Sequence, residues 1–354
     1  MPLPPYRRIL VRATNWVGDA VMSLPALQAV RRCFPDAFIA VLARPWVADL
    51  YAREPFADEV IPYHAARGWR DLGGKWELAR NLRAERFDCA LLLQNAFEAA
   101  ALVLAAGIPD RIGFDRDRRG PLLTHAIACP KPGEIPQHEQ FYYLELLRRA
   151  GWIGELPEND TIRLSGRAAA VTAGREQLAK LGLSRTVIGV SPGAAFGSAK
   201  RWLPERFAES ASALAALLNA QVALFGSRDE RELCESIATQ IGERGQRAHN
   251  LAGKTSLREY IDLAAACRVY LTNDSGGMHI ASALGVPTVA IFGATNHLTT
   301  GPTGPLARVV REPVECAPCL LRECPIDHRC MERVHSDPVV SAALELLQQA
   351  TVLK

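Results

Sequence analysis

The sequence lacks a long uncharged apolar run. The longest such run, from Ala99 to Ile108, is well short of the ~18 residues that a transmembrane helix needs. Arg7 and Arg8 near the N-terminus are followed by an apolar run of only strand length, which is not typical of a secretion signal. We therefore expect a cytoplasmic protein without a transmembrane segment.

The sequence also lacks a large excess of either charge. Its formal net charge is +3 over 354 residues, and 49% of the residues are hydrophobic. This balance does not indicate a nucleic-acid partner, although a weakly basic surface would suit an anionic substrate or an anionic membrane face. The chain is too long for one ordinary hydrophobic core, so it predicts two domains.

Apolar runs of strand length alternate with amphipathic helical patterns, and residues 20–34 have the 3.6-residue spacing of one helix. Strands are expected at 8–13, 38–43, 58–63 and 89–94, and then at 186–193, 221–227, 268–274 and 288–294. Such alternation predicts an α/β protein with parallel sheets and helices on both faces.

A segment rich in Gly, Pro and charge, residues 151–166, separates the two halves. We therefore expect an N-terminal Rossmann-like domain over 1–164 and a C-terminal one over 165–354, with the final helix free to pack back on the first. Two such domains would enclose a cleft, because ligands of open α/β sheets bind outside the carboxyl ends of the strands.

Asp19 follows the first expected strand, within "NWVGDAVMSLPALQAV" (15–30). Aspartate is a favoured helix N-cap, and the local sequence by itself favours that interpretation. A carboxylate near a helix N-terminus is also kept ionised by the helix dipole. Asp19 could therefore instead be a general base at the mouth of a cleft.

The stretch "SPGAAFGSAKRWLPERF" (191–207) follows a buried strand and contains Ser191, Gly193 and Lys200. Pro204 suits the first position of the next helix. Loop amides and a helix N-terminus form an anion site, and Lys200 would add a point charge for a phosphate. The chain has no GxxxxGK[ST] motif, which excludes a nucleotide-hydrolysing phosphate loop of that type. A solvated basic loop is the alternative.

The stretch "LTNDSGGMHIASALGVPTVAIFG" (271–293) places Asp274 and Ser275 at a strand end, before Gly276 and a second glycine. The two polar residues could cap the next helix, whereas the diglycine would let backbone N–H groups approach a diphosphate. His279, in the first turn of that helix, would by itself more often be a structural histidine.

Two acids, Asp229 and Glu230, follow another strand end in "LFGSRDERE" (224–232). An acid at this place binds a ribose hydroxyl in dinucleotide sites. It can equally favour the start of the following helix through the helix dipole. Both interpretations stay open.

The nine cysteines are distributed unevenly along the sequence, which favours a protein of a reducing compartment over one with a disulfide framework. Five scattered copies are expected to be buried free thiols: Cys33, Cys89, Cys129, Cys234 and Cys267. Four are clustered with the spacing Cys-x2-Cys-x4-Cys-x5-Cys: Cys316, Cys319, Cys324 and Cys330. The cluster could be a structural zinc site or a thiol loop without metal. Neither would be a catalytic centre.

Taken in order, these motifs resemble the ADP-heptose:lipopolysaccharide heptosyltransferases of Gram-negative bacteria, in glycosyltransferase family 9, and most closely the heptosyltransferase II members. "NWVGDAVMSLPAL" resembles the N-terminal signature of the family, "AGIPDRIGF" (106–114) its acceptor-domain segment, "SPGAAFGSAKRW" its phosphate loop and "TNDSGGMHIASALGVPTVAIFG" its C-terminal signature. The resemblance implies a GT-B fold and an inverting, metal-independent transfer that requires no cofactor beyond the donor, ADP-heptose.

The resemblance also implies residue roles, with Asp19 as the general base and Lys200 at the diphosphate. The implied donor site comprises Ser191, Gly193, Lys200, Glu230, Thr255, Asp274, Ser275, Gly276 and His279. Within it, Thr255 falls in the adenine-contacting segment and Glu230 near the ribose contact. The chain departs from the family at Ala195, which is often polar or acidic in relatives. The cysteine cluster occurs in only part of the family.

The implied acceptor is the lipid A–core of lipopolysaccharide at the inner leaflet of the inner membrane, on which the protein could be peripheral. Candidate acceptor contacts are Asn15, Asn95, Arg67 and Arg116, the two arginines lying in basic stretches that acids partly balance. A nucleotide-sugar epimerase of similar architecture, or a non-catalytic nucleotide-binding protein with a zinc loop, are the alternatives.

Overall fold

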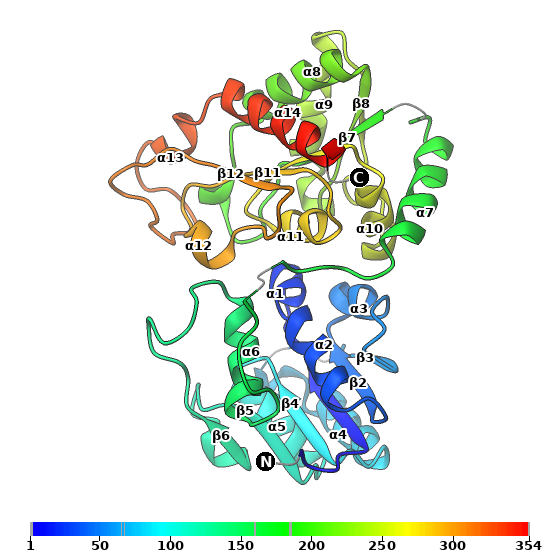
Figure 1. The fold of residues 1–354 in the computed structure, drawn as a ribbon, viewed down its shortest axis with the longest axis vertical. Coiled ribbons are helices and arrows are strands. Elements are labelled where there is room, and N and C mark those ends of the chain that lie inside the picture. The colour runs from blue at the N-terminus through cyan, green and yellow to red at the C-terminus, as the bar shows by residue number, and fades with distance from the viewer. Residues whose placement is uncertain (1–2, 65, 67, 159–160, 184–185, 353–354) are drawn as a thin grey trace. The chain divides into compact units, whose positions relative to one another are not determined.

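The structure is a computed structural model that describes residues 3–64, 66, 68–158, 161–183 and 186–352. The chain forms two compact units, Met1–Asn159 and Asp160–Lys354 (Figure 1). Within the described residues, each unit contains one six-stranded sheet in which every strand pair is parallel. The predicted α/β class with two Rossmann-like units is confirmed.

The first unit has the strand order β3-β2-β1-β4-β5-β6. Its strands are β1 Arg8–Arg12, β2 Phe38–Ala43, β3 Glu59–Pro62, β4 Cys89–Leu92, β5 Asp110–Phe114 and β6 His125–Ile127. Its helices are α1 Val17–Met22, α2 Leu24–Cys33, α3 Pro45–Tyr51, α4 Leu72–Ala84, α5 Phe97–Ala105 and α6 Gln140–Arg149, with short 3-10 turns at Gly68–Asp71 and Gly120–Leu122.

The second unit repeats this order as β12-β11-β10-β7-β8-β9. Its strands are β7 Thr186–Ser191, β8 Ala220–Leu224, β9 Ala248–Asn250, β10 Val269–Asn273, β11 Thr288–Ile291 and β12 Ala307–Val310. Its helices are α7 Arg167–Lys180, α8 Pro204–Leu218, α9 Arg231–Glu243, α10 Leu257–Ala265, α11 Gly276–Ala283, α12 His297–Thr300, α13 Arg329–Glu332 and α14 Ser336–Val352, with 3-10 turns at Ser198–Lys200 and Arg228–Glu230.

The strand order reverses beside the first strand of each unit. In the first unit β1 lies between β2 and β4, and in the second β7 lies between β8 and β10. At such a switch point the two following connections leave in opposite directions, so a crevice opens at the carboxyl ends of the two central strands. The segments after β1, β4, β7 and β10 are therefore the places where a ligand site is expected.

Two of the expectations about elements are wrong. Residues 20–34 form two helices rather than one, with Ser23 between α1 and α2. Pro25 has no N–H to donate to the preceding turn, and the Ser23 hydroxyl donates to the Ala20 carbonyl at 2.8 Å. The sequence patterns also missed β5, β6, β9 and β12, because most of these strands are short and only partly buried, so no apolar run marks them.

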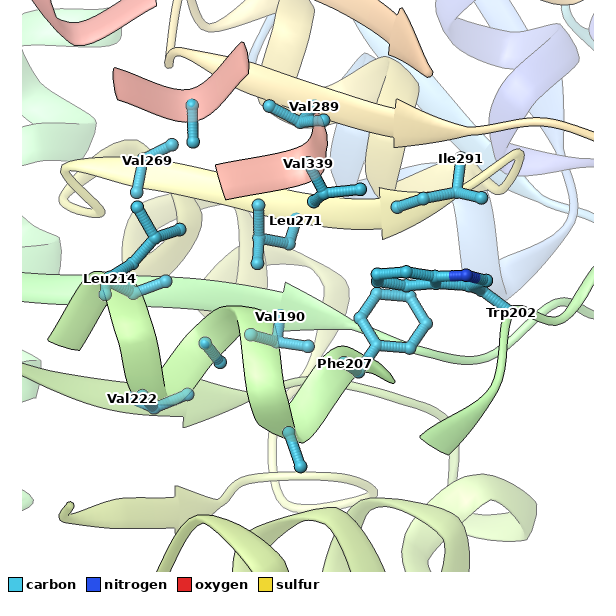
Figure 2. Close-up of a cluster of buried hydrophobic side chains, with 14 of the residues drawn as sticks. Val190, Trp202, Phe207, Leu214, Val222, Val269, Leu271, Val289, Ile291 and Val339 are labelled. Atoms are coloured by element: carbon cyan, nitrogen blue, oxygen red, sulfur yellow. The ribbon is translucent and has the colours of Figure 1, made fainter. Parts of the chain in front are cut away.

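The core of the second unit packs the apolar face of its sheet against α8 and α14. Figure 2 shows Val190, Leu271 and Ile291 beside the Trp202 and Phe207 rings, whose centroids are 5.0 Å apart. The Trp202 indole N–H donates to the Val334 carbonyl at 3.0 Å. This packing anchors the segment between β7 and α8, which contains Lys200.

Helix α14, whose place the sequence left open, packs against α8, β11 and β12 of its own unit (Figure 1). In the part of the chain that the structure describes, no helix combines the length and apolar character needed to span a membrane.

Candidate active site

Asp19 lies in the first turn of α1, the helix that follows β1. The helix begins at Val17, and its N-cap is Trp16, whose side chain makes no capping bond. Asp19 is therefore not the N-cap, and the capping interpretation is wrong. Its carboxylate is nevertheless close to the free N–H groups of a helix start, where a negative charge is favourable.

Asp19 lines a cavity of about 430 Å³ within the first unit. The cavity is formed by residues that follow β1, β2 and β4, together with one tyrosine of α6. They are Thr14, Asn15, Trp16, Asp19, Arg44, Leu93, Gln94, Asn95, Ala96, Glu98 and Tyr143. The cavity thus lies at the switch point of this sheet, and it brings Asn15 and Asn95 together with Asp19.

The Asn15 carboxamide is oriented by a buried arginine at the end of β1. Arg12 donates from Nη2 to Asn15 Oδ1 at 3.2 Å, and the Trp46 indole donates to the Asn15 carbonyl at 2.7 Å. Burial lowers the pKa of Arg12 to about 10, which still leaves the guanidinium charged at neutral pH. Asn15 is therefore held in place by donors that do not themselves line the cavity.

Asn95 is held in a similar way. Its Nδ2 donates to the Tyr142 hydroxyl at 2.9 Å, and its Oδ1 accepts from Nη2 of the fully buried Arg119 at 3.1 Å. Arg116 does not line the cavity, but it is exposed and hydrogen-bonds Tyr142, which raises the pKa of Arg116. Arg67 lies outside the described residues.

The cavity contains a second carboxylate, Glu98, which accepts from the Tyr63 hydroxyl and from Lys75 Nζ, the latter at 3.1 Å. A third acid, Glu139, lies close enough to Asp19 for the charge of Asp19 to affect its pKa. Burial first, and then the charge of Asp19, raise the pKa of Glu139 above its ordinary value, while Arg116 opposes this shift. The charges of Asp19 and Glu139 are therefore close enough to interact.

Sequence reasoning missed Arg44, Glu98 and Tyr143. Arg44 is the first residue after β2, and Glu98 lies in the first turn of α5, the helix that follows β4. Their positions at strand ends could have identified both of them. Tyr143 is in the middle of α6, and no local pattern shows that this helix reaches the cavity.

In the second unit, Lys200 and Asp274 form a buried ion pair at the corresponding switch point. Lys200 Nζ is 2.6 Å from Asp274 Oδ2, and the two side chains are 13% and 5% exposed. Thr295, after β11, donates its hydroxyl to the same carboxylate oxygen at 2.6 Å. Three loops that follow β7, β10 and β11 therefore meet at Asp274.

Ser191, the last residue of β7, belongs to a chain of three hydroxyl groups. Ser191 Oγ is 2.7 Å from the Tyr270 hydroxyl, which is 2.8 Å from the Tyr260 hydroxyl. A Cβ atom added at Gly277 would lie 2.7 Å from Tyr260 Oη and 3.1 Å from Ser191 Oγ. The second glycine of the diglycine is thus required by close packing against this chain.

Ser275 and Gly276 start α11. Ser275 is the N-cap, yet its hydroxyl makes no capping bond and lies 3.2 Å from that of Thr272. Gly276 is the first helical residue. His279, one turn further on, is buried at 4% exposure. The backbone N–H groups of this helix start are therefore available at the carboxyl edge of the sheet.

Glu230 does serve as part of a helix cap, since the Ser227 N–H donates to its Oε2 at 2.8 Å. Its carboxylate also packs directly against Gly193, where an added Cβ would lie 2.0 Å from Oε1. The Gly253 N–H donates to the Gly226 carbonyl at 3.0 Å, and Thr255 follows two residues later. Glu230 and Thr255 therefore belong to neighbouring loops, after β8 and β9.

The cysteines are all free thiols. The expectation of buried thiols is wrong for Cys33 and Cys129, which are half-buried. Cys33 is the last residue of α2, and its thiol donates to the Trp152 carbonyl at 3.1 Å. Of the cluster, Cys316 is exposed and Cys330 is buried, and burial, followed by the other three thiols, raises the pKa of Cys330 to about 11. Across the described residues, no three potential ligands converge as a metal ion requires.

A larger hollow of about 550 Å³ lies at the opposite edge of the second sheet, near Thr186, Arg268 and Pro287. These residues lie at the amino ends of β7, β10 and β11. Since ligands of open α/β sheets bind at the carboxyl ends, this hollow is not the candidate site.

Comparison with known proteins identifies the family of this chain. The model of glycosyltransferase family 9 (heptosyltransferase) matches residues 75–329. The chain is 35% identical over 314 residues to lipopolysaccharide heptosyltransferase 2 of Salmonella typhimurium, covering 86% of this chain and 88% of the relative.

Solved structures show the same fold. The ADP-heptose LPS heptosyltransferase II of E. coli matches with a TM-score of 0.80 at 31% identity, covering 97% of this chain and 99% of that chain. A family 9 glycosyl transferase from Veillonella parvula matches with a TM-score of 0.83 at 22% identity, covering 99% of both chains, which supports the fold alone. The expected GT-B fold is therefore confirmed, and the chain belongs to glycosyltransferase family 9, the heptosyltransferases, and is a glycosyltransferase enzyme.

Proposed function

We propose that this enzyme transfers heptose from ADP-L-glycero-D-manno-heptose to the inner core of lipopolysaccharide, adding the second heptose to heptosyl-Kdo2-lipid A. The choice of donor and acceptor is supported by the 35% identity to lipopolysaccharide heptosyltransferase 2 of Salmonella typhimurium. The observation that carries the proposal is the pair of switch-point sites, one containing Asp19 and the other containing Lys200 and Asp274.

The donor would bind to the second unit. Lys200, the amides of the loop after β7 and the start of α11 would bind the diphosphate, with Ser191, Gly193 and Ser275 beside it. Glu230 would contact the ribose and Thr255 the adenine. Lys200 is already fixed by Asp274 at 2.6 Å, so it needs little reorganisation when negative charge develops on the leaving ADP. These groups would perform the work that a metal ion performs in other glycosyltransferases.

The acceptor would bind to the first unit, in the cavity that Asp19 shares with Asn15, Asn95 and Arg44. Asp19 would accept the proton of an acceptor hydroxyl, whose oxygen attacks the anomeric carbon from the face opposite ADP. A new C–O bond forms as the bond to the diphosphate breaks, which inverts the anomeric configuration. General base catalysis of this kind contributes about 10²–10⁴-fold. The lipid-linked acceptor would place the enzyme at the inner leaflet of the inner membrane.

The test is product analysis after the enzyme is mixed with ADP-heptose and defined core acceptors, including heptosyl-Kdo2-lipid A. We expect one added heptose of inverted configuration, and full activity in the presence of EDTA. Sugar turnover without any acceptor would indicate an epimerase instead. ADP binding without turnover on any acceptor would indicate a binding protein. Loss of activity in EDTA that added divalent metal restores would contradict the metal-independent mechanism.

A further inference from the structure

The segment that contains the clustered cysteines lies against the phosphate loop. We define the cysteine segment as residues 316–330. The Ala199 N–H donates to the carbonyl of Arg322 at 3.0 Å, and the ring Nε2 of His328 lies 3.0 Å from the Ala199 carbonyl. Two points of the cysteine segment therefore hold the residue that immediately precedes Lys200.

The cysteine segment is also bonded to the loop after β11. The Leu320 N–H donates to the Ala294 carbonyl at 2.8 Å, and the next residue, Thr295, donates its hydroxyl to Asp274. The backbone at 320–322 is thus attached to two of the three loops that meet at the Lys200–Asp274 pair. These bonds fix the backbone position of Arg322, from which its side chain extends.

The Arg322 side chain and Lys200 share one aromatic ring. The Arg322 guanidinium carbon is 5.3 Å and Lys200 Nζ is 4.9 Å from the centroid of Phe196, whose residue is 38% exposed. The charge of Lys200 is balanced by Asp274, whereas Arg322 forms no ion pair with any residue that the structure describes. Of the two cations beside Phe196, Arg322 therefore contributes the uncompensated positive charge.

We propose that Arg322 is a donor-binding residue that contacts the diphosphate of the nucleotide sugar. This inference rests on the proposed function, because it assumes that the donor diphosphate binds at the phosphate loop. A diphosphate spreads its charge over two phosphoryl groups, and one lysine that is neutralised by an aspartate matches only part of it. A guanidinium offers a planar set of donors for phosphate oxygens, and Phe196 would hold it by a cation–π contact.

The experiment compares Arg322→Gln and Arg322→Lys with the wild-type enzyme by isothermal titration calorimetry, using ADP and adenosine as ligands. Arg322→Gln keeps the backbone carbonyl that Ala199 binds, so the brace on the phosphate loop is retained. Arg329→Gln is the matched control, because it removes the same charge from a neighbouring residue that is already paired with Asp327 at 2.9 Å and Glu315 at 3.3 Å.

We expect Arg322→Gln to weaken ADP binding by about 5- to 20-fold, and Arg322→Lys to weaken it less. Adenosine binding should stay unchanged, and Arg329→Gln should bind ADP as the wild type does. With ADP-heptose, the KM of Arg322→Gln should rise. The ADP affinity of the wild type should also fall more steeply with added salt than that of Arg322→Gln.

Three results would overturn the assignment of Arg322 while leaving the proposed function in place. They are wild-type ADP affinity in Arg322→Gln, an equal loss of ADP and adenosine affinity, and an equal loss in Arg329→Gln. A wild-type enzyme that binds no ADP would overturn the proposed function and the assignment together.

Discussion

The buried ion pair between Lys200 and Asp274 gives the sharpest test of the donor site. Both side chains are largely removed from solvent, at 13% and 5% exposed, and the two atoms are 2.6 Å apart. Removing one partner of such a pair leaves an uncompensated buried charge, which typically costs about 3–5 kcal/mol. We take about 3 kcal/mol for Lys200→Met or Asp274→Asn, because Thr295 still binds an oxygen of residue 274 and Lys200 retains some exposure.

The assay is a double-mutant cycle measured by differential scanning calorimetry. For a unit of this size, about 3 kcal/mol corresponds to roughly 6–12 °C in the Tm of the second unit. The double variant should be less destabilised than the sum of the single variants, with a coupling energy of about 1–3 kcal/mol. The exposed pair Arg206–Glu209 is the control, since its side chains are 30% and 50% exposed and its coupling should stay below about 0.5 kcal/mol.

The same variants connect stability with donor binding. Lys200→Met should weaken ADP binding, because it removes the charge that faces the diphosphate. If the losses in unfolding free energy of the two single variants sum to that of the double variant within about 0.5 kcal/mol, the reasoning is refuted, since additivity is the behaviour of independent sites. The Lys200–Asp274 contact would then be no stronger than a surface pair.

Three further predictions concern single residues. Asp19→Asn should lower kcat by about 10²–10⁴-fold and leave ADP affinity unchanged; a wild-type rate would exclude Asp19 as the base. Gly277→Ala should weaken ADP binding, because the new Cβ would lie 2.7 Å from the Tyr260 hydroxyl, and Tyr260→Phe should partly restore binding; tight ADP binding in Gly277→Ala would contradict this packing. Burial and the charge of Asp19 raise the pKa of Glu139 above its ordinary value of 4.5, so its ionisation costs stability as pH rises through the raised value. The Tm at pH 7 minus the Tm at pH 4 should therefore be larger for Glu139→Gln than for the wild type. Parallel curves of Tm against pH for the two proteins would contradict this prediction.

The arrangement of elements was largely predictable from local patterns. The eight expected strands all exist with similar bounds. All but β3 are largely buried, and buried parallel strands are continuous apolar runs. Helix α8 begins at Pro204 as expected, since proline fits the first helical position. The missed strands are short or half-exposed. The helix break at Ser23 depends on Pro25, because proline removes a backbone hydrogen bond, and the spacing of apolar residues does not show this effect.

The candidate site also has features that the sequence predicts and features that only the structure shows. The sequence by itself determined that Asp19, Lys200 and Asp274 follow strands, because the ends of apolar runs are local features of the chain. Only the tertiary structure decided that Lys200 pairs with Asp274, that Asn15 and Asn95 share a cavity with Asp19, and that Arg322 lies beside Phe196. The physical reason is the strand order: β1 pairs with β4 and β7 with β10, so residues far apart in the sequence meet at the same edge of a sheet.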